Sequence, residues 1–146
     1  MPLNALVGLL LFWQGASNSF DVLVVDAFSG DAVPVHLLTK EAMAVYIRHL
    51  SPSGILAFHL TNQYLDLPPI VQQLAVSAGY PASQVASFGD RDRMISAAVW
   101  VFATRNQMFL SREEIARATA KIPERTGLRL WTDDYNNLFQ AIKWKP

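Results

Sequence analysis

Short apolar runs alternate with amphipathic stretches along most of this chain, and this alternation constrains the fold more than any other feature. Residues 22–25 (Val-Leu-Val-Val) suit a strand buried on both faces, and residues 55–60 suit a second strand. An amphipathic stretch separates the two runs. Strands that alternate with helices are typical of β-α-β units and of a mainly parallel sheet. The sequence therefore predicts an α/β fold.

Helix signals flank the second strand on both sides. Thr39 is placed to cap a helix whose apolar residues recur at the spacing of one buried face, and residues 51–54 (Ser-Pro-Ser-Gly) are expected to end it. A second helix is predicted over residues 70–78, with Gly79 at its carboxyl end. Each helix would then connect two successive strands.

The second half of the chain carries weaker signals. A short strand is expected at residues 85–88, and a stronger one at residues 97–103, which are rich in Val, Trp and Phe. Ser111 and Glu114 form a capping-box pair ahead of a helix that Pro123 is expected to end. No repeat or low-complexity tract divides this part of the chain from the rest. We therefore expect one structural unit.

Asp26 directly follows the first predicted strand and opens a loop of turn-forming residues, 27–31. Open α/β sheets bind ligands at the carboxyl ends of their strands, so this carboxylate is expected to face a crevice. There it can accept a proton from a ligand or hold a cationic group. The alternative is an Asx turn, in which Asp26 accepts hydrogen bonds from the backbone N–H groups of the loop.

Asn62 and Tyr64 follow the second predicted strand and are expected on the same rim of the sheet as Asp26. Either they line a substrate pocket, or Asn62 caps its own loop and the Tyr64 ring is half-buried. His59, at the end of this strand, is interpreted as a packed histidine rather than a ligand. The rim is therefore the expected location of the substrate site.

Two adjacent carboxylates, Asp133 and Asp134, lie in the tail of the chain. Their negative potential can attract a cationic ligand, which would be a polyamine if the resemblance described below holds. Alternatively, Thr132 and Asp133 cap a helix that begins near Tyr135. The residue pattern is compatible with both hypotheses.

Two separated segments of the chain form a familiar pattern. The first begins at residues 21–31 (Asp-Val-Leu-Val-Val-Asp-Ala-Phe-Ser-Gly-Asp) and continues with residues 37–39 (Leu-Leu-Thr) and 53–56 (Ser-Gly-Ile-Leu). The second is residues 131–138 (Trp-Thr-Asp-Asp-Tyr-Asn-Asn-Leu). Together they resemble the spermidine and spermine synthase family, particularly the bacterial spermidine-synthase-like domains that are fused to transporter-like membrane segments. The tail is similar to that group's C-terminal Thr-Asp-Asp signature.

The resemblance implies a Rossmann-like fold of the class I S-adenosylmethionine-dependent methyltransferase type, of which this chain would be the C-terminal half. Its strands would be the fourth to seventh of that fold, and residues 97–103 would form an antiparallel strand inserted between its neighbours. Asp26 would be the catalytic acid–base residue. Ser29 and Asp31 would contact the substrate, although the family usually places a second Asp where this chain has Ser29.

The family reaction is aminopropyl transfer from decarboxylated S-adenosylmethionine to a polyamine or another small amine. In the family, the Gly-x-Gly-x-Gly loop and the acidic residue that hold this donor lie upstream of the matched strands, and residues 1–20 contain neither. We therefore expect residues 21–146 to be a partial domain that is weak or inactive alone, and its cofactor-binding residues stay unassigned. The alternatives are an S-adenosylmethionine-dependent methyltransferase and a non-catalytic half-domain that acts by association.

Composition argues against several other kinds of partner. The chain has no Cys and three scattered His residues, so neither a disulfide framework nor a metal site is predicted. Its 12 basic and 12 acidic residues cancel, so no overall field recruits nucleic acid. A small-molecule substrate remains the expected ligand.

The first 20 residues are mostly apolar, with an unbroken apolar run at residues 5–13. A transmembrane helix needs about 20 residues, so no transmembrane span is predicted and a cytoplasmic protein is expected. The run has the length of a signal-peptide core but no preceding Lys or Arg, and a buried strand or helix is the alternative.

The strands that would flank residues 22–25 are missing, so we expect this edge to be covered by residues 5–13, by a second copy, or by a partner N-terminal half.

Overall fold

The structure of the protein, a computed structural model, describes residues 17–26, 33–90, 92, 94 and 96–143. Within this part of the chain, five strands form one sheet in the order β1-β2-β4-β3-β5. The strands are β1 (Phe20–Val25), β2 (Leu50–His59), β3 (Ala82–Ser87), β4 (Ala98–Thr104) and β5 (Thr119–Ala120).

The pairings between strands give their directions. β1 and β2 are parallel, with Val25 opposite Phe58. β4 is antiparallel to both β2 and β3, so β1, β2 and β3 share one direction and β4 lies between β2 and β3 with the opposite one. This arrangement confirms the predicted α/β fold, the shared direction of most strands and the inserted antiparallel strand. The parallel β1–β2 pair, connected through a helix, is the Rossmann-like part of the sheet.

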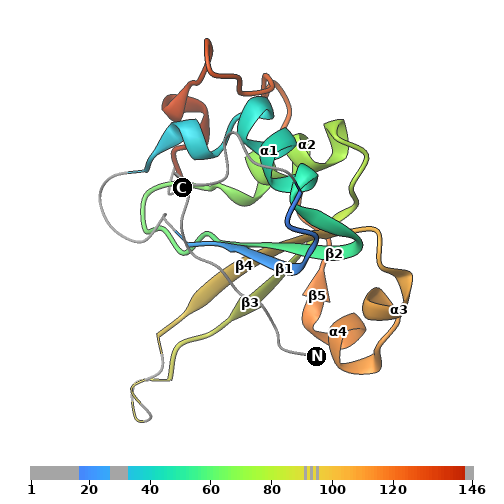
Figure 1. Cartoon of the computed structure of the whole chain (residues 1–146). Helices are drawn as coiled ribbons and strands as arrows, with labels where there is room; N and C mark the ends of the chain where they lie inside the picture. The colour runs from blue at the N-terminus through green and yellow to red at the C-terminus, as the bar shows by residue number, and fades with distance from the viewer. Residues whose placement is uncertain (1–16, 27–32, 91, 93, 95, 144–146) are drawn as a thin grey trace.

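Two longer helices cover one face of the sheet, as Figure 1 shows. α1 (Lys40–Arg48) connects β1 to β2, and α2 (Pro68–Ser77) connects β2 to β3. The shorter helices are η1 (Val35–Leu37), α3 (Gln107–Leu110), α4 (Glu113–Ala118) and η2 (Leu138–Ala141). α3 and α4 lie beside β5, away from α1 and α2 (Figure 1).

Local signals determine where α1 and α2 begin and end. The Thr39 side chain accepts a hydrogen bond from the backbone N–H of Ala42 at 3.2 Å, so Thr39 caps α1 as predicted. α2 begins with Pro68 and Pro69, which suit a first turn because its N–H groups have no partner within the helix. Gly79 follows α2 with φ of 77°, the left-handed conformation that favours glycine. Both predicted helices are therefore confirmed.

Apolar side chains fill the space between the sheet and the two longer helices. Phe58 of β2 and Val101 of β4 are fully buried there, and the ring of Tyr46 on α1 packs edge-on against Phe58 at 5.9 Å between centroids. Side chains alternate between the faces of a strand, so Val24 and Trp100 lie on the opposite face, where they are only half-buried. The prediction that the first strand is buried on both faces is therefore wrong for this second face.

The residues predicted to end α1, 51–54, lie inside β2 instead. Leu50 already pairs with Phe20 of β1, so pairing with the neighbouring strand overrides the helix-stopping sequence. The two strands approach closely at Gly54, where a Cβ atom would lie 2.8 Å from the carbonyl oxygen of Phe20.

The region after β4 departs from the predicted helix. α3, which was not predicted, is capped by Asn106, whose side chain accepts a hydrogen bond from the N–H of Phe109 at 2.9 Å. Ser111 is the C-terminal cap of α3, so the predicted capping box between Ser111 and Glu114 does not form. α4 ends well before Pro123, because the chain leaves it to form β5 at the edge of the sheet.

The tail forms a tight turn where a helix was one of the two hypotheses. The backbone N–H of Thr132 donates to the carbonyl of Tyr135 at 2.8 Å, and the N–H of Tyr135 donates back at 3.1 Å. This exchange prevents a helix from beginning near Tyr135, so the hypothesis that Thr132 and Asp133 cap one is wrong. The next helical turn is η2, which Asn137 caps by accepting from the N–H of Phe139 at 3.1 Å.

The residues that the structure describes include neither a membrane-spanning helix nor a cluster of metal ligands. No helix among them is long and apolar enough to cross a bilayer. No group of three or more candidate metal ligands occurs among them either. The apolar run at residues 5–13, with its signal-peptide and strand or helix alternatives, lies outside the described residues.

Candidate functional site

Asp26 and His59 meet at the carboxyl ends of the two parallel strands. Because Val25 and Phe58 are partners in the register, the next residues along the two strands also lie side by side. Nδ1 of His59 lies 2.9 Å from Oδ1 of Asp26. The Asp26 side chain is 43% exposed and that of His59 is 22% exposed, so the contact is partly open to solvent.

The hydrogen bonds of His59 assign its tautomer. An ionised carboxylate only accepts hydrogen bonds, so Nδ1 of His59 carries the proton that it donates to Asp26. In the neutral imidazole, Nε2 then accepts from the hydroxyl of Thr61, which lies 2.8 Å away. The Thr61 oxygen in turn accepts from the backbone N–H of Val99 at 2.9 Å. A continuous chain of hydrogen bonds therefore runs from the backbone at the start of β4 to the Asp26 carboxylate.

The ring of His59 is also held by an aromatic contact. His59 of β2 and Trp100 of β4 are partners in the antiparallel register. Their rings stack with 4.6 Å between centroids and 20° between planes. Phe102 continues the stack beside Trp100 at 6.5 Å. Two hydrogen bonds and one stacked face therefore fix the orientation of the imidazole.

The Asp26 carboxylate has one oxygen engaged and one available. Oδ1 accepts from His59, and Oδ2 has no hydrogen-bond partner among the residues that the structure describes. An exposed carboxylate oxygen at the carboxyl end of a strand can accept an N–H from a cationic ligand or take a proton from it. The alternative Asx turn would involve the loop at residues 27–32, which lies outside the described residues.

The loop after β2 places Asn62 and Tyr64 on the same rim as Asp26. Oδ1 of Asn62 accepts hydrogen bonds from the backbone N–H groups of Tyr64 at 2.9 Å and Leu65 at 2.8 Å, so Asn62 caps its own loop. Tyr64 is 61% exposed, so its side chain is not the half-buried one of the alternative hypothesis. Within the part of the chain that the structure describes, neither side chain is hydrogen-bonded to Asp26.

Ser29 and Asp31, which the resemblance assigns to substrate binding, lie outside the residues that the structure describes.

Asp133 binds the start of α1 rather than the Asp26 site. Its Oδ1 accepts from the hydroxyl of Thr39 at 2.7 Å, and its backbone N–H donates to Oε2 of Glu41 at 3.0 Å. A carboxylate near the amino end of a helix is stabilised by the helix dipole. Asp134 is exposed beside it. The structure therefore gives Asp133 a role in attaching the tail, and does not bring Asp133 or Asp134 into contact with Asp26 within the described residues.

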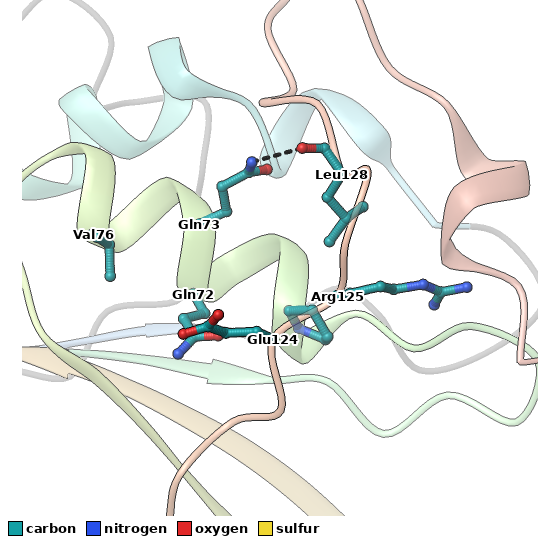
Figure 2. A pocket seen from close by; sticks show the side chains of 7 residues that line it. Gln72, Gln73, Val76, Glu124, Arg125 and Leu128 are labelled. Carbon is teal, nitrogen blue, oxygen red and sulfur yellow. Dashed lines mark hydrogen bonds between the residues drawn. The ribbon is translucent and has the colours of Figure 1, made fainter.

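A separate hollow lies between α2 and the tail segment 124–128, as Figure 2 shows. The side chain of Gln73 reaches across it and donates to the carbonyl of Leu128 at 2.9 Å. Arg125, one of its two charged residues, forms an ion pair with Asp66 at 3.6 Å. The residues that line it are Pro69, Gln72, Gln73, Val76, Glu124, Arg125 and Leu128. None of the predicted site residues belongs to this hollow.

The sequence interpretation missed the partnership of His59 and Thr61 with Asp26. One signal could have revealed it: Asp26 follows the run at residues 22–25 as His59 follows residues 55–58. If two parallel neighbours are aligned in that register, the two polar residues become adjacent. The observed register, Val22 opposite Ile55 through Val25 opposite Phe58, has this alignment.

Comparisons with known proteins gave structural similarities only. No protein-family model matches the sequence, and no curated protein matches it. Among solved structures, a spermidine synthase in complex with the transition-state analogue AdoDATO has 16% identity and a TM-score of 0.46 over 75% of this chain and 39% of its own. Spermidine synthase from Thermotoga maritima has 16% identity and a TM-score of 0.44 over 75% and 38%.

A third structure has similar values. A probable spermidine synthase from Corynebacterium glutamicum ATCC 13032 has 14% identity and a TM-score of 0.43, over 79% of this chain and 51% of its own. The chain thus spans about two fifths to one half of the length of these structures. At this level the similarity assigns neither an activity nor a substrate to the chain.

Proposed function

We propose that this chain is a spermidine-synthase-like aminopropyltransferase domain, in which Asp26 receives the proton of the attacking amine and holds that amine. The observation that carries the proposal is the Asp26 carboxylate itself, exposed at the carboxyl end of β1 with one oxygen bound to His59. The sequence resemblance around residues 21–31 supports the same role. A polyamine or another small amine is the proposed acceptor.

The proposed reaction is a displacement at the carbon beside a sulfonium. The amine nitrogen forms a bond to that carbon, the carbon–sulfur bond breaks, and its electrons leave with sulfur as a neutral thioether. The attacking nitrogen must be unprotonated, so the proton of the ammonium form goes to Oδ2 of Asp26. General-base help of this kind is worth about two to four powers of ten in rate, and holding the reactants together is worth more.

The donor side of the site has to be supplied by other residues. The 146 residues contain no Gly-x-Gly-x-Gly motif, which is the usual phosphate- or nucleoside-binding loop of such folds. We therefore assign the amine side of the reaction to this chain and the contacts to decarboxylated S-adenosylmethionine to a partner N-terminal half. The chain alone is expected to be weak or inactive.

Two alternatives remain beside this proposal. An S-adenosylmethionine-dependent amine methyltransferase is less well supported, because the chain lacks the Asn-Pro-Pro-Tyr-like motif that such enzymes often use. A non-catalytic half-domain that acts by association is favoured by the half-buried second face of the sheet, where Val24 and Trp100 lie.

The experiment is calorimetric titration of the chain with spermidine and, separately, with methylthioadenosine. We expect saturable spermidine binding that weakens about tenfold in Asp26→Asn, because the lost charge removes about 1.4 kcal/mol of attraction. Glu114→Gln, which removes an exposed charge on α4, is the matched control and should bind like the wild type. We expect weak or no binding of methylthioadenosine. Equal spermidine binding by wild type and Asp26→Asn, or no binding by either, would contradict the proposal.

A further inference from the structure

His59 makes more contacts than a packed histidine needs. Both of its ring nitrogens are hydrogen-bonded, Nδ1 to Asp26 at 2.9 Å and Nε2 to Thr61 at 2.8 Å, and one ring face stacks on Trp100. Thr61 is itself fixed by the N–H of Val99. The ring therefore has a defined position, a defined rotation and a defined tautomer before any ligand arrives.

This arrangement constrains a side chain that would otherwise move freely. Asp26 lies beyond the end of β1 and its side chain is 43% exposed, so packing alone does not select a rotamer. A ligand that binds a freely rotating carboxylate must order it, and ordering a side chain costs free energy. The hydrogen bond from His59 imposes that order in advance. It also occupies Oδ1 and leaves Oδ2 as the acceptor that is available to a ligand.

We propose that His59, held by Thr61 and Trp100, is the positioning residue for Asp26 and presents Oδ2 of its carboxylate to the amine. The inference rests on the proposed function, because it assigns a task to the same site. His59 itself does not contact the amine in this proposal. It acts through the Asp26 carboxylate, and Thr61 acts one step further away by keeping the proton of His59 on Nδ1.

A purely structural role for His59 makes different predictions. In that case the contact would only join β1 to β2, and any loss of it would lower stability without a specific effect on amine binding. Two substitutions separate the possibilities. His59→Asn keeps an N–H donor near the position of Nδ1, whereas His59→Leu keeps a similar volume and removes the donor.

The first experiment is spermidine titration of the chain carrying each substitution, with thermal unfolding measured alongside. We expect His59→Leu to bind about fivefold to tenfold more weakly, and His59→Asn to stay within about twofold of the wild type. If Asp26→Asn loses binding but His59→Leu does not, the proposed function stands and the positioning role is overturned. Equal losses in His59→Leu and His59→Asn, at equal stability, also overturn it.

The second experiment does not depend on ligand binding. ¹⁵N NMR of the imidazole distinguishes a protonated Nδ1 from a protonated Nε2, and we expect Nδ1 to carry the proton in the neutral ring. Thr61→Val removes the hydroxyl and should shift the Nε2 resonance of His59 while the chain stays folded. Should no variant bind spermidine, the proposed function fails, and this spectrum decides the geometry separately. A His59 protonated on Nε2, or one that is insensitive to Thr61→Val, overturns the inference.

Discussion

His59 donates a hydrogen bond from Nδ1 to Oδ1 of Asp26 over 2.9 Å, and so joins the last residue of β2 to the residue that follows β1. The two residues are 33 positions apart in the sequence. Only the parallel pairing of the strands brings them together. The site is therefore a product of strand register, and the predictions below test the elements that hold it in place.

The buried hydroxyl of Tyr46 predicts a loss of stability in alkaline solution. Burial raises the pKa of Tyr46 above its ordinary value of 10.0, because the ionised phenolate would lose its hydration. The unfolded chain releases this proton more easily than the folded one. Stability from the neutral hydroxyl is therefore complete below pH 10.0 and falls as the pH rises above it.

Tyr46→Phe is the variant that measures this effect. It also removes the hydrogen bond from the Tyr46 hydroxyl to the carbonyl of Leu37 at 3.1 Å, so we expect it to cost about 1 kcal/mol at neutral pH. Above pH 10.0 the difference from the wild type should shrink. Denaturant unfolding at a series of pH values checks this. A difference that stays constant with pH would contradict the prediction.

The contact between Thr39 and Asp133 predicts that the tail stabilises α1. The Thr39 hydroxyl donates to Asp133 at 2.7 Å and also accepts from the N–H of Ala42, so one buried side chain caps the helix and anchors the tail. We expect Thr39→Val to lower the free energy of unfolding by about 1–2 kcal/mol. Asp133→Ala should cost less, and Asp134→Ala close to nothing.

A double-mutant cycle tests the contact itself. If Thr39 and Asp133 interact as observed, the combined variant should cost less than the sum of the two single variants. Additive costs would mean that the hydrogen bond contributes nothing measurable.

How far the fold follows from the sequence depends on the range of each interaction. The cap at Thr39 and the left-handed Gly79 are set by their immediate neighbours, and both were predicted correctly. The capping box at Ser111 was wrong because a second helix, capped by Asn106, uses the same serine at its end. Local signals compete there, and the sequence contains no measure of which one prevails.

The core of the site was harder to predict for a physical reason. The candidate Asp26 came from its place after an apolar run, but its contact with His59 depends on the alignment of β1 with β2. That alignment includes an irregularity between Phe20 and Val22, so the strand starts do not determine it. A shift by one residue would turn His59 to the opposite face of the sheet.

The half-buried face of the sheet predicts association. Val22 and Val24 of β1 lie on this face, and β1 is the edge strand of the sheet among the described residues. We expect sedimentation velocity to show a dimer or larger species at micromolar concentration, and Val24→Lys to shift it toward monomer. Val76→Lys on α2, at a side chain that is 58% exposed, is the matched control. A stable monomer at every concentration would contradict this prediction.

The most direct test of the account is NMR titration of the chain, labelled with ¹³C at its aspartate carboxyl groups, with spermidine. The account predicts that the Asp26 carboxyl resonance moves and saturates, that the His59 ¹⁵N resonances move with it, and that Asp134 moves little. The amine should reach Oδ2 of Asp26 because Oδ1 is already bound by His59. If the Asp26 resonance does not move, or if all carboxyl resonances move together without saturation, then Asp26 does not hold the amine and the central claim is wrong.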